Sequence, residues 1–316
     1  MRGAIPWQAG QVFKCLNGIG ESRHEDKISA RAQGARGSHE IGQNTVIHSR
    51  NTRDHYFNVV VDFCRYQKDH FGIKDVENTS GEAIKQYMLD RIDSGKIGQY
   101  STFKFEASAL EKFNAGLNRY AEKHETGHSY RLSEDIKEAR VYARDTMDSP
   151  ETDSRAYADA KGVIASIENQ DNHLGAKVQH EAGFRIHEVS LIHEEQRKGI
   201  RQETVTGEER GVIEVQGKGG KVYEGMVSQE TYRELENHIK DNGEFAIDKA
   251  DYGRDLRAAA LEHGEDYHGS HDLRHTHAQE RFHEIQENGY SREDARQIVS
   301  RELGHERPDI TERYLL

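Results

Sequence analysis

The sequence HDLRHT at positions 271–276, followed by LGH at positions 303–305 and by Tyr314, is the part of the chain that decides its fold. The first stretch opens a predicted helix and the second closes a later one. Each motif alone arises often by chance, and the chain contains 19 histidines. The ordered set, with the tyrosine nine residues after the last histidine, is far more informative than any of its parts.

Two stretches further upstream complete this set. The sequence AGFRIHEV at positions 182–189 places Arg185 at the start of a predicted helix, shortly after a glycine. The strand-like stretches VIEV (212–215) and VYEGMV (222–227) are separated by the turn sequence GKGG. They predict a β-hairpin with Lys218 in its turn.

In this order and with these spacings, the set resembles the tyrosine recombinase (phage integrase) family. That family has an arginine in a Gly-x-Arg-x-x-Glu context, a hairpin lysine, His-x-x-Arg, Leu-Gly-His and then a tyrosine, and all six positions are filled here. By motif the resemblance covers residues 150–316, and over residues 50–146 it rests on helical pattern alone. It implies an α-rich multidomain fold, with an N-terminal helical bundle (core-binding, SAM-like) and a C-terminal mixed α/β tyrosine-recombinase catalytic domain that has a small antiparallel sheet.

The resemblance also implies a reaction. The protein would be a site-specific DNA recombinase or integrase that cleaves and rejoins strands through a 3′-phosphotyrosyl intermediate and a Holliday junction. Tyr314 is the implied nucleophile, and the phosphotyrosine would store the bond energy, so that religation needs no ATP. Arg185 and Arg274 would hold the non-bridging phosphate oxygens, because guanidinium groups match them bidentately and stay charged.

Three further side chains have implied roles in moving protons and stabilising charge. His305 would donate a hydrogen bond to the developing charge, and His271 would assist the deprotonation of Tyr314. Lys218 would protonate the departing 5′ oxygen. Because side chains neutralise the charge, we expect no metal ion and no cofactor. The expected partners are double-stranded DNA and further copies of the chain, as a homotetramer on two DNA sites.

Three of these assignments have a rival. Lys221 lies three residues after Lys218 in the same hairpin and is its rival, but Lys218 in the turn is the favoured residue. Tyr290 is a remote rival for the nucleophile, on the wrong side of the Leu-Gly-His motif. Arg185 alone has a simpler explanation, as the surface ion-pair partner of Glu188 or Glu181.

The chain before the catalytic motifs divides into an arm and a bundle. Residues 1–48 are rich in Gly, Ser, Arg and Glu with weak periodicity, so we predict a poorly packed, flexible N-terminal arm with one short helix near positions 11–16. Apolar residues at helical spacing then predict a core DNA-binding domain over residues 49–146. Its four helices are expected from position 51 onward and at 81–92, 102–123 and 133–146.

A break at Pro150 separates this bundle from a catalytic domain over residues 150–316. Besides the hairpin, this domain is expected to contain a short helix after Arg185 and a short one with Tyr314. Longer helices are predicted at 154–168, 172–182, 229–240, 249–262, 272–287 and 292–302.

The charge balance argues against a nucleic-acid partner. The chain has 56 acidic and 44 basic residues and a formal net charge of -12, whereas binding to DNA requires cations that neutralise phosphates. Basic residues gathered on one face would remove the conflict, and so would an organism whose proteins are generally acidic.

Other bulk features bound the location. No run of eighteen apolar residues exists, so we expect no membrane partner. The first ten residues have no apolar stretch of signal-peptide length, so we expect a cytoplasmic protein. Cys15 and Cys64 have no metal-ligand or redox spacing and are expected to be free thiols.

Three other functions compete with recombination. A non-catalytic DNA-binding relative acting as a regulator would be marked by the loss of an active-site residue, and none is lost. A tyrosine topoisomerase would generally lack the histidine that His271 supplies. The sequence HETGH, from His124 to His128, matches the HExxH zinc-protease motif, in which two histidines one helical turn apart bind zinc. Its flanks are charged rather than apolar, which disfavours a zinc metalloprotease.

Overall fold

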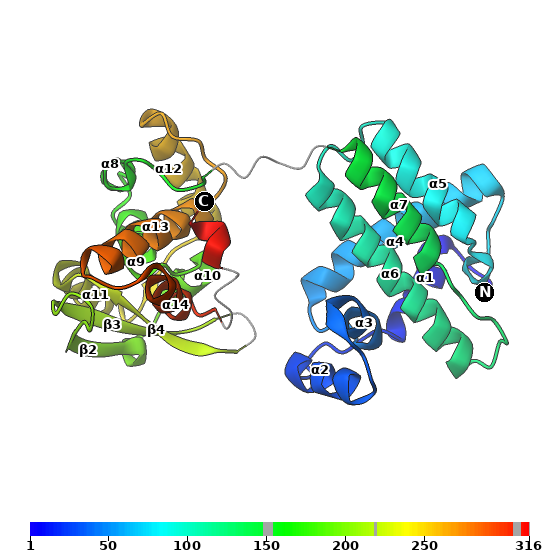
Figure 1. Ribbon diagram of the computed structural model, residues 1–316, viewed down its shortest axis with the longest axis horizontal. Helices are drawn as coiled ribbons and strands as arrows, with labels where there is room; N and C mark the ends of the chain where they lie inside the picture. The colour runs from blue at the N-terminus through cyan, green and yellow to red at the C-terminus, as the bar shows by residue number, and fades with distance from the viewer. Residues whose placement is uncertain (148–153, 218–219, 306–310, 316) are drawn as a thin grey trace. The chain divides into compact units, whose positions relative to one another are not determined.

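The computed structural model describes residues 1–147, 154–217, 220–305 and 311–315. The chain divides into two compact units, Met1–Glu151 and Thr152–Leu316 (Figure 1). The break expected at Pro150 lies outside the described residues. Within the described ranges, no helix is both long enough and apolar enough to cross a membrane.

Unit 1 is made of helices. Serine side chains accept hydrogen bonds from the first turns of several of them, for example Ser80 from Ala83 N at 3.2 Å, and so mark where these helices begin. Gly72, with a φ of 71°, ends the helix Arg50–Phe71 in the left-handed conformation that glycine favours. The elements are α1 (Ile5–Lys14), α2 (Arg23–Ala32), α3 (Gly37–Asn44), α4 (Arg50–Phe71), η1 (Val76–Asn78), α5 (Gly81–Asp93), α6 (Tyr100–Lys123) and α7 (Ser133–Thr146).

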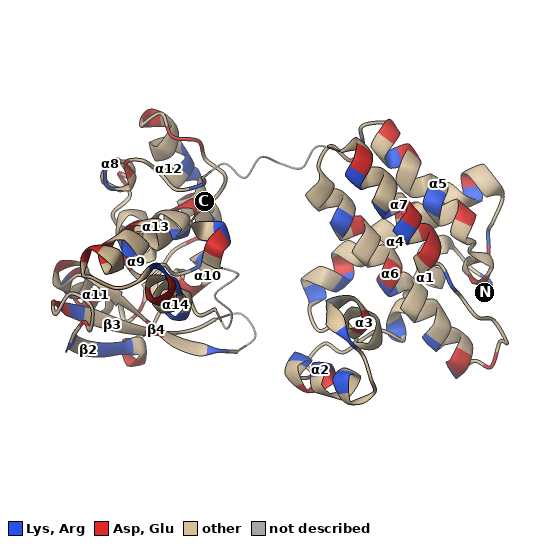
Figure 2. Ribbon diagram, viewed as in Figure 1, with Lys and Arg blue, Asp and Glu red and all other residues tan. Residues whose placement is uncertain are grey.

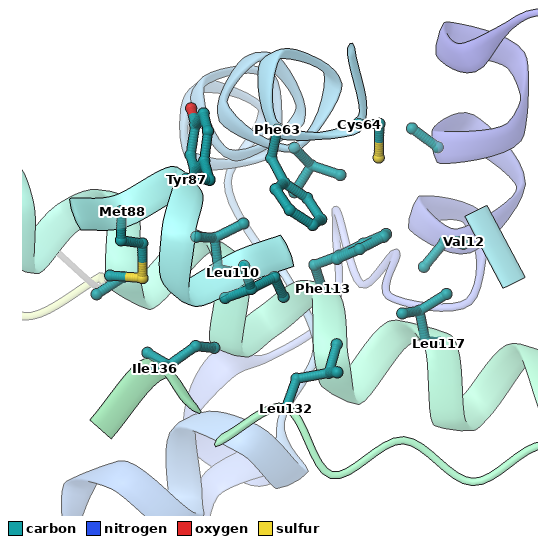
Figure 3. Packing of buried hydrophobic residues seen from close by; sticks show 14 of the residues in the cluster. Val12, Phe63, Cys64, Tyr87, Met88, Leu110, Phe113, Leu117, Leu132 and Ile136 are labelled. Carbon is teal, nitrogen blue, oxygen red and sulfur yellow. The ribbon is translucent and has the colours of Figure 1, made fainter. Parts of the chain in front are cut away.

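The core of unit 1 forms around α6, whose buried residues run from Phe103 to Ala121. Phe113 of α6 packs edge-on against Phe63 of α4, with ring centroids 6.2 Å apart. Leu110 and Leu117 extend the same contact surface, and Ile136 joins it from α7 (Figure 3). The four predicted bundle helices correspond to α4, α5, α6 and α7.

The prediction of a poorly packed arm over residues 1–48 is wrong. The segment forms three helices, and Val12 and Leu16 are fully buried in the core of unit 1. Helix α1 approaches α6 closely at Gly116, where a β-carbon would lie 2.7 Å from the Val12 Cγ1 atom. The apolar spacing from Ala9 through Val12 and Phe13 to Leu16 follows the helical repeat, so the signal was present but was outweighed by the polar composition around it.

Unit 2 combines helices with two small antiparallel sheets. The larger sheet has the strand order β2-β3-β4, and β1 pairs with β5. The predicted hairpin is confirmed as β3 and β4, with Gln216 opposite Val222, but its turn residue Lys218 lies outside the described residues. The elements are α8 (Ala160–Ala165), α9 (Gln170–Ala182), α10 (Ile186–Val189), β1 (Leu191–Ile192), η2 (Glu194–Gln196), β2 (Arg197–Gln202), β3 (Glu209–Gln216), β4 (Val222–Val227), α11 (Gln229–Asn242), β5 (Phe245–Ala246), α12 (Lys249–Glu262), α13 (His271–Glu287), α14 (Arg292–Glu302) and η3 (Glu312–Tyr314).

The helix predicted at 154–168 is shorter than expected. Asp159 caps α8 by accepting a hydrogen bond from Gly162 N at 2.9 Å, so the helix begins only at Ala160. Before it, the backbone N–H of Tyr157 donates to Thr276 Oγ1 on α13 at 2.9 Å. A tertiary contact has replaced the helical hydrogen bonds of this segment. The predicted fold class, an α-rich chain with a small antiparallel sheet, is confirmed.

Candidate active site

Helix α13 carries the centre of the candidate site. It crosses the middle of unit 2 (Figure 1), and Arg274, His275 and Thr276 on its first turns are buried although they are polar. His271 is the first residue of the helix. Because His271, Arg274 and His275 are three and four residues apart, their side chains lie on one face of α13.

The hydroxyl group of Tyr314 lies on that face. The turn η3, red in Figure 1, packs against α13 and places the Tyr314 oxygen 3.0 Å from the Nε2 atom of His271. The tyrosine ring stacks on the ring of His275, with centroids 4.4 Å apart and an interplanar angle of 26°. The His305 ring lies 5.2 Å from it and the Arg274 guanidinium carbon 5.8 Å.

The guanidinium group of Arg274 joins three of the sequence motifs. It is fully buried and donates hydrogen bonds to the carbonyl oxygens of Gly183 and Leu303. One of its terminal nitrogens lies 3.2 Å from His305 Nε2. Its Nε–H group has no hydrogen-bond partner among the residues that the structure describes. Arg274 is therefore held in place by backbone groups and has donor capacity left for a ligand.

Gly183 has a structural reason to be glycine. Its φ is +63°, a left-handed conformation that ends α9. A β-carbon at this position would lie 2.5 Å from the His277 Cδ2 atom, inside van der Waals contact. The glycine thus lets the turn before Arg185 approach α13 closely enough for the Gly183 carbonyl to accept from Arg274.

Arg185 is oriented by a buried carboxylate. Glu188, whose side chain is completely buried, accepts from the Arg185 backbone N–H at 2.6 Å and from its guanidinium group at 2.9 Å. The Tyr223 hydroxyl donates to the same carboxylate at 2.6 Å. Burial tends to raise the pKa of Glu188, but these hydrogen bonds outweigh it and lower the pKa. The ion pair expected from the simpler explanation of Arg185 exists, and it fixes the arginine beside the site.

Of the two hairpin lysines, only Lys221 is described. Its Nζ atom lies 3.3 Å from the carbonyl oxygen of Gly304, within the Leu-Gly-His motif. Its charge is also among the causes that lower the pKa of His305. The rival of Lys218 therefore reaches the candidate site.

The histidines of the site are held in their neutral form. Burial is the largest cause, and the nearby Arg274 charge adds to it, so that the pKa of His271 falls to about 3. The same two causes lower the pKa of His305 to about 4. Burial, followed by the charges of Arg155 and Arg274, lowers the pKa of His275 to about 4. At neutral pH each of these imidazoles is therefore uncharged and has one nitrogen with a lone pair that can accept a hydrogen bond or a proton.

Comparisons with known proteins bear on the fold. No protein-family model matches the sequence, and no curated protein matches it. Several solved structures match the chain, and two of them are structures of XerH site-specific recombinase. The complex with difH substrate before cleavage has a TM-score of 0.62 at 15% identity and covers 98% of this chain and 91% of its own. The post-cleavage complex with palindromic difH substrate has a TM-score of 0.60 at 14% identity, with the same coverage.

The chain has the fold of a tyrosine recombinase. This agrees with the resemblance found in the motifs. On this tyrosine recombinase fold, the described residues of the predicted set converge from segments far apart in sequence. Tyr314 and His271 are in contact, Arg274 and His305 are in contact, and the charge of Arg185 lowers the pKa of both histidines. Lys218 lies outside the described residues, so its position stays a prediction.

The sequence motifs do not include several residues of the candidate site. His275 stacks on Tyr314 but had no assigned role, although its spacing of four from His271 puts it on the same helical face. Thr311 is buried and lies 3.2 Å from the Nδ1 atom of His305. Arg155 contacts Asp272 from more than a hundred positions away, and no sequence pattern indicates such a pair.

The zinc-protease alternative is contradicted by the local fold. Helix α6 ends at Lys123, and Glu125 has a φ of 50°, so the HExxH segment is not helical. The two histidines lie instead against separate tyrosines. The His124 ring is tilted on Tyr120 with centroids 4.2 Å apart, and His128 stacks on Tyr130 at 5.9 Å. They do not form the one-turn pair that the motif requires.

The rival nucleophile Tyr290 is remote from the site. It lies in the turn after α13, whose first residue is His271 and whose last is Glu287. At 1.5 Å per residue, the two ends of this helix are about 24 Å apart. Tyr290 is thus at the opposite end of α13 from the histidine that contacts Tyr314.

Proposed function

We propose that the protein is a site-specific DNA recombinase that cleaves and rejoins DNA strands through a 3′-phosphotyrosyl intermediate at Tyr314. The observation that carries the proposal is the contact between the Tyr314 hydroxyl and His271 Nε2 at 3.0 Å, beside the buried guanidinium group of Arg274. A nucleophile, a neutral base and a fixed cation are the three groups that phosphoryl transfer requires at one point.

In the proposed cleavage step, the Tyr314 oxygen attacks the scissile phosphorus and the phosphorus–5′-oxygen bond breaks. The tyrosine proton passes to His271 Nε2, which is neutral before the reaction because its pKa is low. The phosphate brings negative charge close to this imidazole, which raises its basicity at the moment when it has to accept the proton.

The charge that develops on the phosphate is stabilised by side chains that are already in position. Arg274 and Arg185 donate to the non-bridging oxygens, and their fixation by Gly183, Leu303 and Glu188 means that little reorganisation is needed during the reaction. His305 Nε2 accepts from Arg274 in the DNA-free chain, and His305 donates to the phosphate once the substrate displaces this contact. A hairpin lysine, Lys218 or its rival Lys221, protonates the departing 5′ oxygen.

Rejoining is the reverse of cleavage with a different strand. The 5′ hydroxyl of a partner duplex attacks the phosphotyrosyl bond and releases Tyr314, which yields a Holliday junction, and a second round resolves it. The proposal requires two DNA sites and four copies of the chain. Binding of a DNA substrate by the two similar XerH structures supports double-stranded DNA as the partner.

The proposal is tested with a trapped intermediate. DNA that the protein binds is first selected from a random library and then nicked near the protected centre, so that the short 5′-hydroxyl fragment diffuses away after cleavage. In EDTA, the wild-type protein is expected to give a slow band on a denaturing gel, and Tyr314→Phe is expected to give none while binding the same DNA. Binding without any such band in the wild type would favour a non-catalytic DNA-binding protein.

A further inference from the structure

Asp272 is a buried carboxylate within the motif that carries His271 and Arg274. Its side chain has no exposed surface. It accepts hydrogen bonds from two guanidinium nitrogens of Arg155, at 3.0 and 2.7 Å, and from the His268 backbone N–H at 2.7 Å. Burial is the largest influence on this carboxyl group and raises its pKa. Asp272 therefore depends on Arg155 for the opposite charge that a buried carboxylate needs.

Arg155 comes from the very start of unit 2, 117 positions before Asp272. The same guanidinium group also donates to the His268 carbonyl oxygen at 3.0 Å. A second tie follows two residues later, where the Tyr157 backbone donates to Thr276 Oγ1 at 2.9 Å. Arg155 and Tyr157, near the start of unit 2, are thus hydrogen-bonded to the first turns of α13 and to the residue His268 before it.

We propose that Arg155 is a positioning residue for the active centre, which fixes the first turn of α13 and with it the side chains of His271 and Arg274. The inference rests on the proposed function. The side chain of Asp272 stands between the two site residues in sequence, so any shift that frees this carboxylate moves the backbone that carries both of them. Displacement of a reacting group by about 1 Å is enough to slow an enzymatic step by roughly 10²-fold.

Arg155 also acts on the site through its charge. The groups that face His271 are Arg274 and His275 from α13, Arg185 from the turn before α10, Arg155, and Tyr314 from η3. All four of the charged or titratable groups other than Tyr314 lower the pKa of His271. Removal of the Arg155 charge should therefore raise this pKa and move the acidic limb of the cleavage rate to higher pH.

The test compares Arg155→Gln and Arg155→Lys with Arg254→Gln, which removes an arginine whose ion pair with Asp251 lies on the surface of α12. Formation of the Tyr314-linked DNA adduct is followed in single turnover, beside DNA affinity. We expect Arg155→Gln to slow adduct formation by at least about tenfold, to leave DNA affinity within about threefold, and to shift the acidic limb upward. Arg155→Lys keeps the charge, so it should form the adduct slowly while the acidic limb of its pH–rate profile stays at the wild-type pH. Arg254→Gln should match the wild type.

Amide hydrogen exchange gives a readout that does not require DNA cleavage. Exchange across residues 268–274 should be faster in Arg155→Gln than in the wild type, while exchange in the core of unit 1 stays the same. If Arg155→Gln folds poorly, the double variant Arg155→Gln/Asp272→Asn removes the unpaired charge and is measured in its place. A wild-type rate, a wild-type pH profile or unchanged exchange in Arg155→Gln would overturn the inference. If the double variant is measured in its place, a wild-type rate or unchanged exchange would overturn it.

The two proposals fail in different ways. If the wild-type protein forms no Tyr314-linked adduct on DNA that it binds, the proposed function fails, and the exchange measurement alone then decides whether Arg155 fixes α13. If the wild type forms the adduct and Arg155→Gln forms it equally fast, only the role of Arg155 fails.

Discussion

The guanidinium group of Arg274 contacts backbone carbonyls from two other sequence motifs, at Gly183 and at Leu303, and lies beside the ring of Tyr314. At the scale of single residues, this arrangement explains why an arginine stands here. A planar group with five donors can hold two carbonyl oxygens and still present a donor to a phosphate. The ammonium group of a lysine is too compact to do both.

Arg274→Lys should therefore lose cleavage although it keeps the positive charge. We expect the rate of adduct formation to fall by roughly 10²-fold or more, about 3 kcal/mol of transition-state stabilisation, as for the loss of a fixed donor to a developing oxyanion. Single-turnover kinetics with a nicked duplex measure this rate, and a native gel measures affinity. A rate near that of the wild type would show that Arg274 does not act on the phosphate.

The histidines of the site also predict how stability depends on pH. Burial and nearby cations lower the pKa of His305 to about 4 in the folded chain, against an ordinary value of 6.5. As the pH falls, the unfolded chain therefore binds this proton before the folded chain does. The contribution of neutral His305 to the free energy of unfolding is present above pH 6.5 and is lost as the pH falls toward 4. His305→Gln should reduce the loss of unfolding free energy between pH 7 and pH 5, whereas His283→Gln, at an exposed position of α13, should not. Urea unfolding at the two pH values checks this, and identical slopes for both variants would contradict it.

At the scale of elements, the contact between α1 and α6 is the feature that sequence composition hid. Leu16→Ala should lower the unfolding free energy by about 2–5 kcal/mol, because the leucine is fully buried in the core of unit 1. Ile28→Ala on α2, where the side chain is 50% exposed, serves as the matched control and should change it by less than about 0.5 kcal/mol. Denaturant unfolding measures both. Equally small changes in unfolding free energy for both variants would support the prediction of a flexible N-terminal arm.

The β3–β4 hairpin raises the question of which lysine donates the leaving-group proton. We expect Lys218→Ala to cleave slowly on an ordinary duplex and to regain its rate on DNA with sulfur in place of the departing 5′ oxygen, because a thiolate leaves without protonation. Lys221→Ala should cleave both substrates at wild-type rate. If the sulfur substrate rescues Lys221→Ala instead, the proton donor is the lysine beside Gly304.

What the sequence could predict follows the range of the interactions. The hairpin and the helices from α9 to α14 have local patterns, so their positions were predicted to within a few residues. The strand β2 was missed because its residues are mostly exposed and polar, and it is defined by pairing with β3. The Arg155–Asp272 pair and the stacking of His275 on Tyr314 arise only when distant segments meet. Helical spacing places His275 on the face of His271, but no local pattern indicates either partner.

At the scale of the whole molecule, the acidic charge is unevenly divided. Residues 1–151 contain 22 basic and 22 acidic residues, whereas residues 152–316 contain 22 basic and 34 acidic ones, so the whole excess of -12 belongs to unit 2. Along the helices of unit 1, cations and anions lie close together (Figure 2). Within unit 2, several glutamates are used up in buried pairs, such as Glu203 with Arg281 and Glu188 with Arg185. Each such pair takes up one cation for each anion, so the acidic excess of unit 2 remains, and DNA binding requires basic groups that are presented locally at the site.

The central claim is that Tyr314 forms a covalent bond with DNA, and mapping that bond tests it most directly. The wild-type protein is trapped on a nicked duplex that it binds, the adduct is digested with protease and nuclease, and the modified peptide is identified by mass spectrometry. A phosphodeoxynucleotide is expected on Tyr314 and on no other residue. A nucleotide attached to Tyr290 or to any other side chain, or DNA cleavage that persists in Tyr314→Phe, would contradict it.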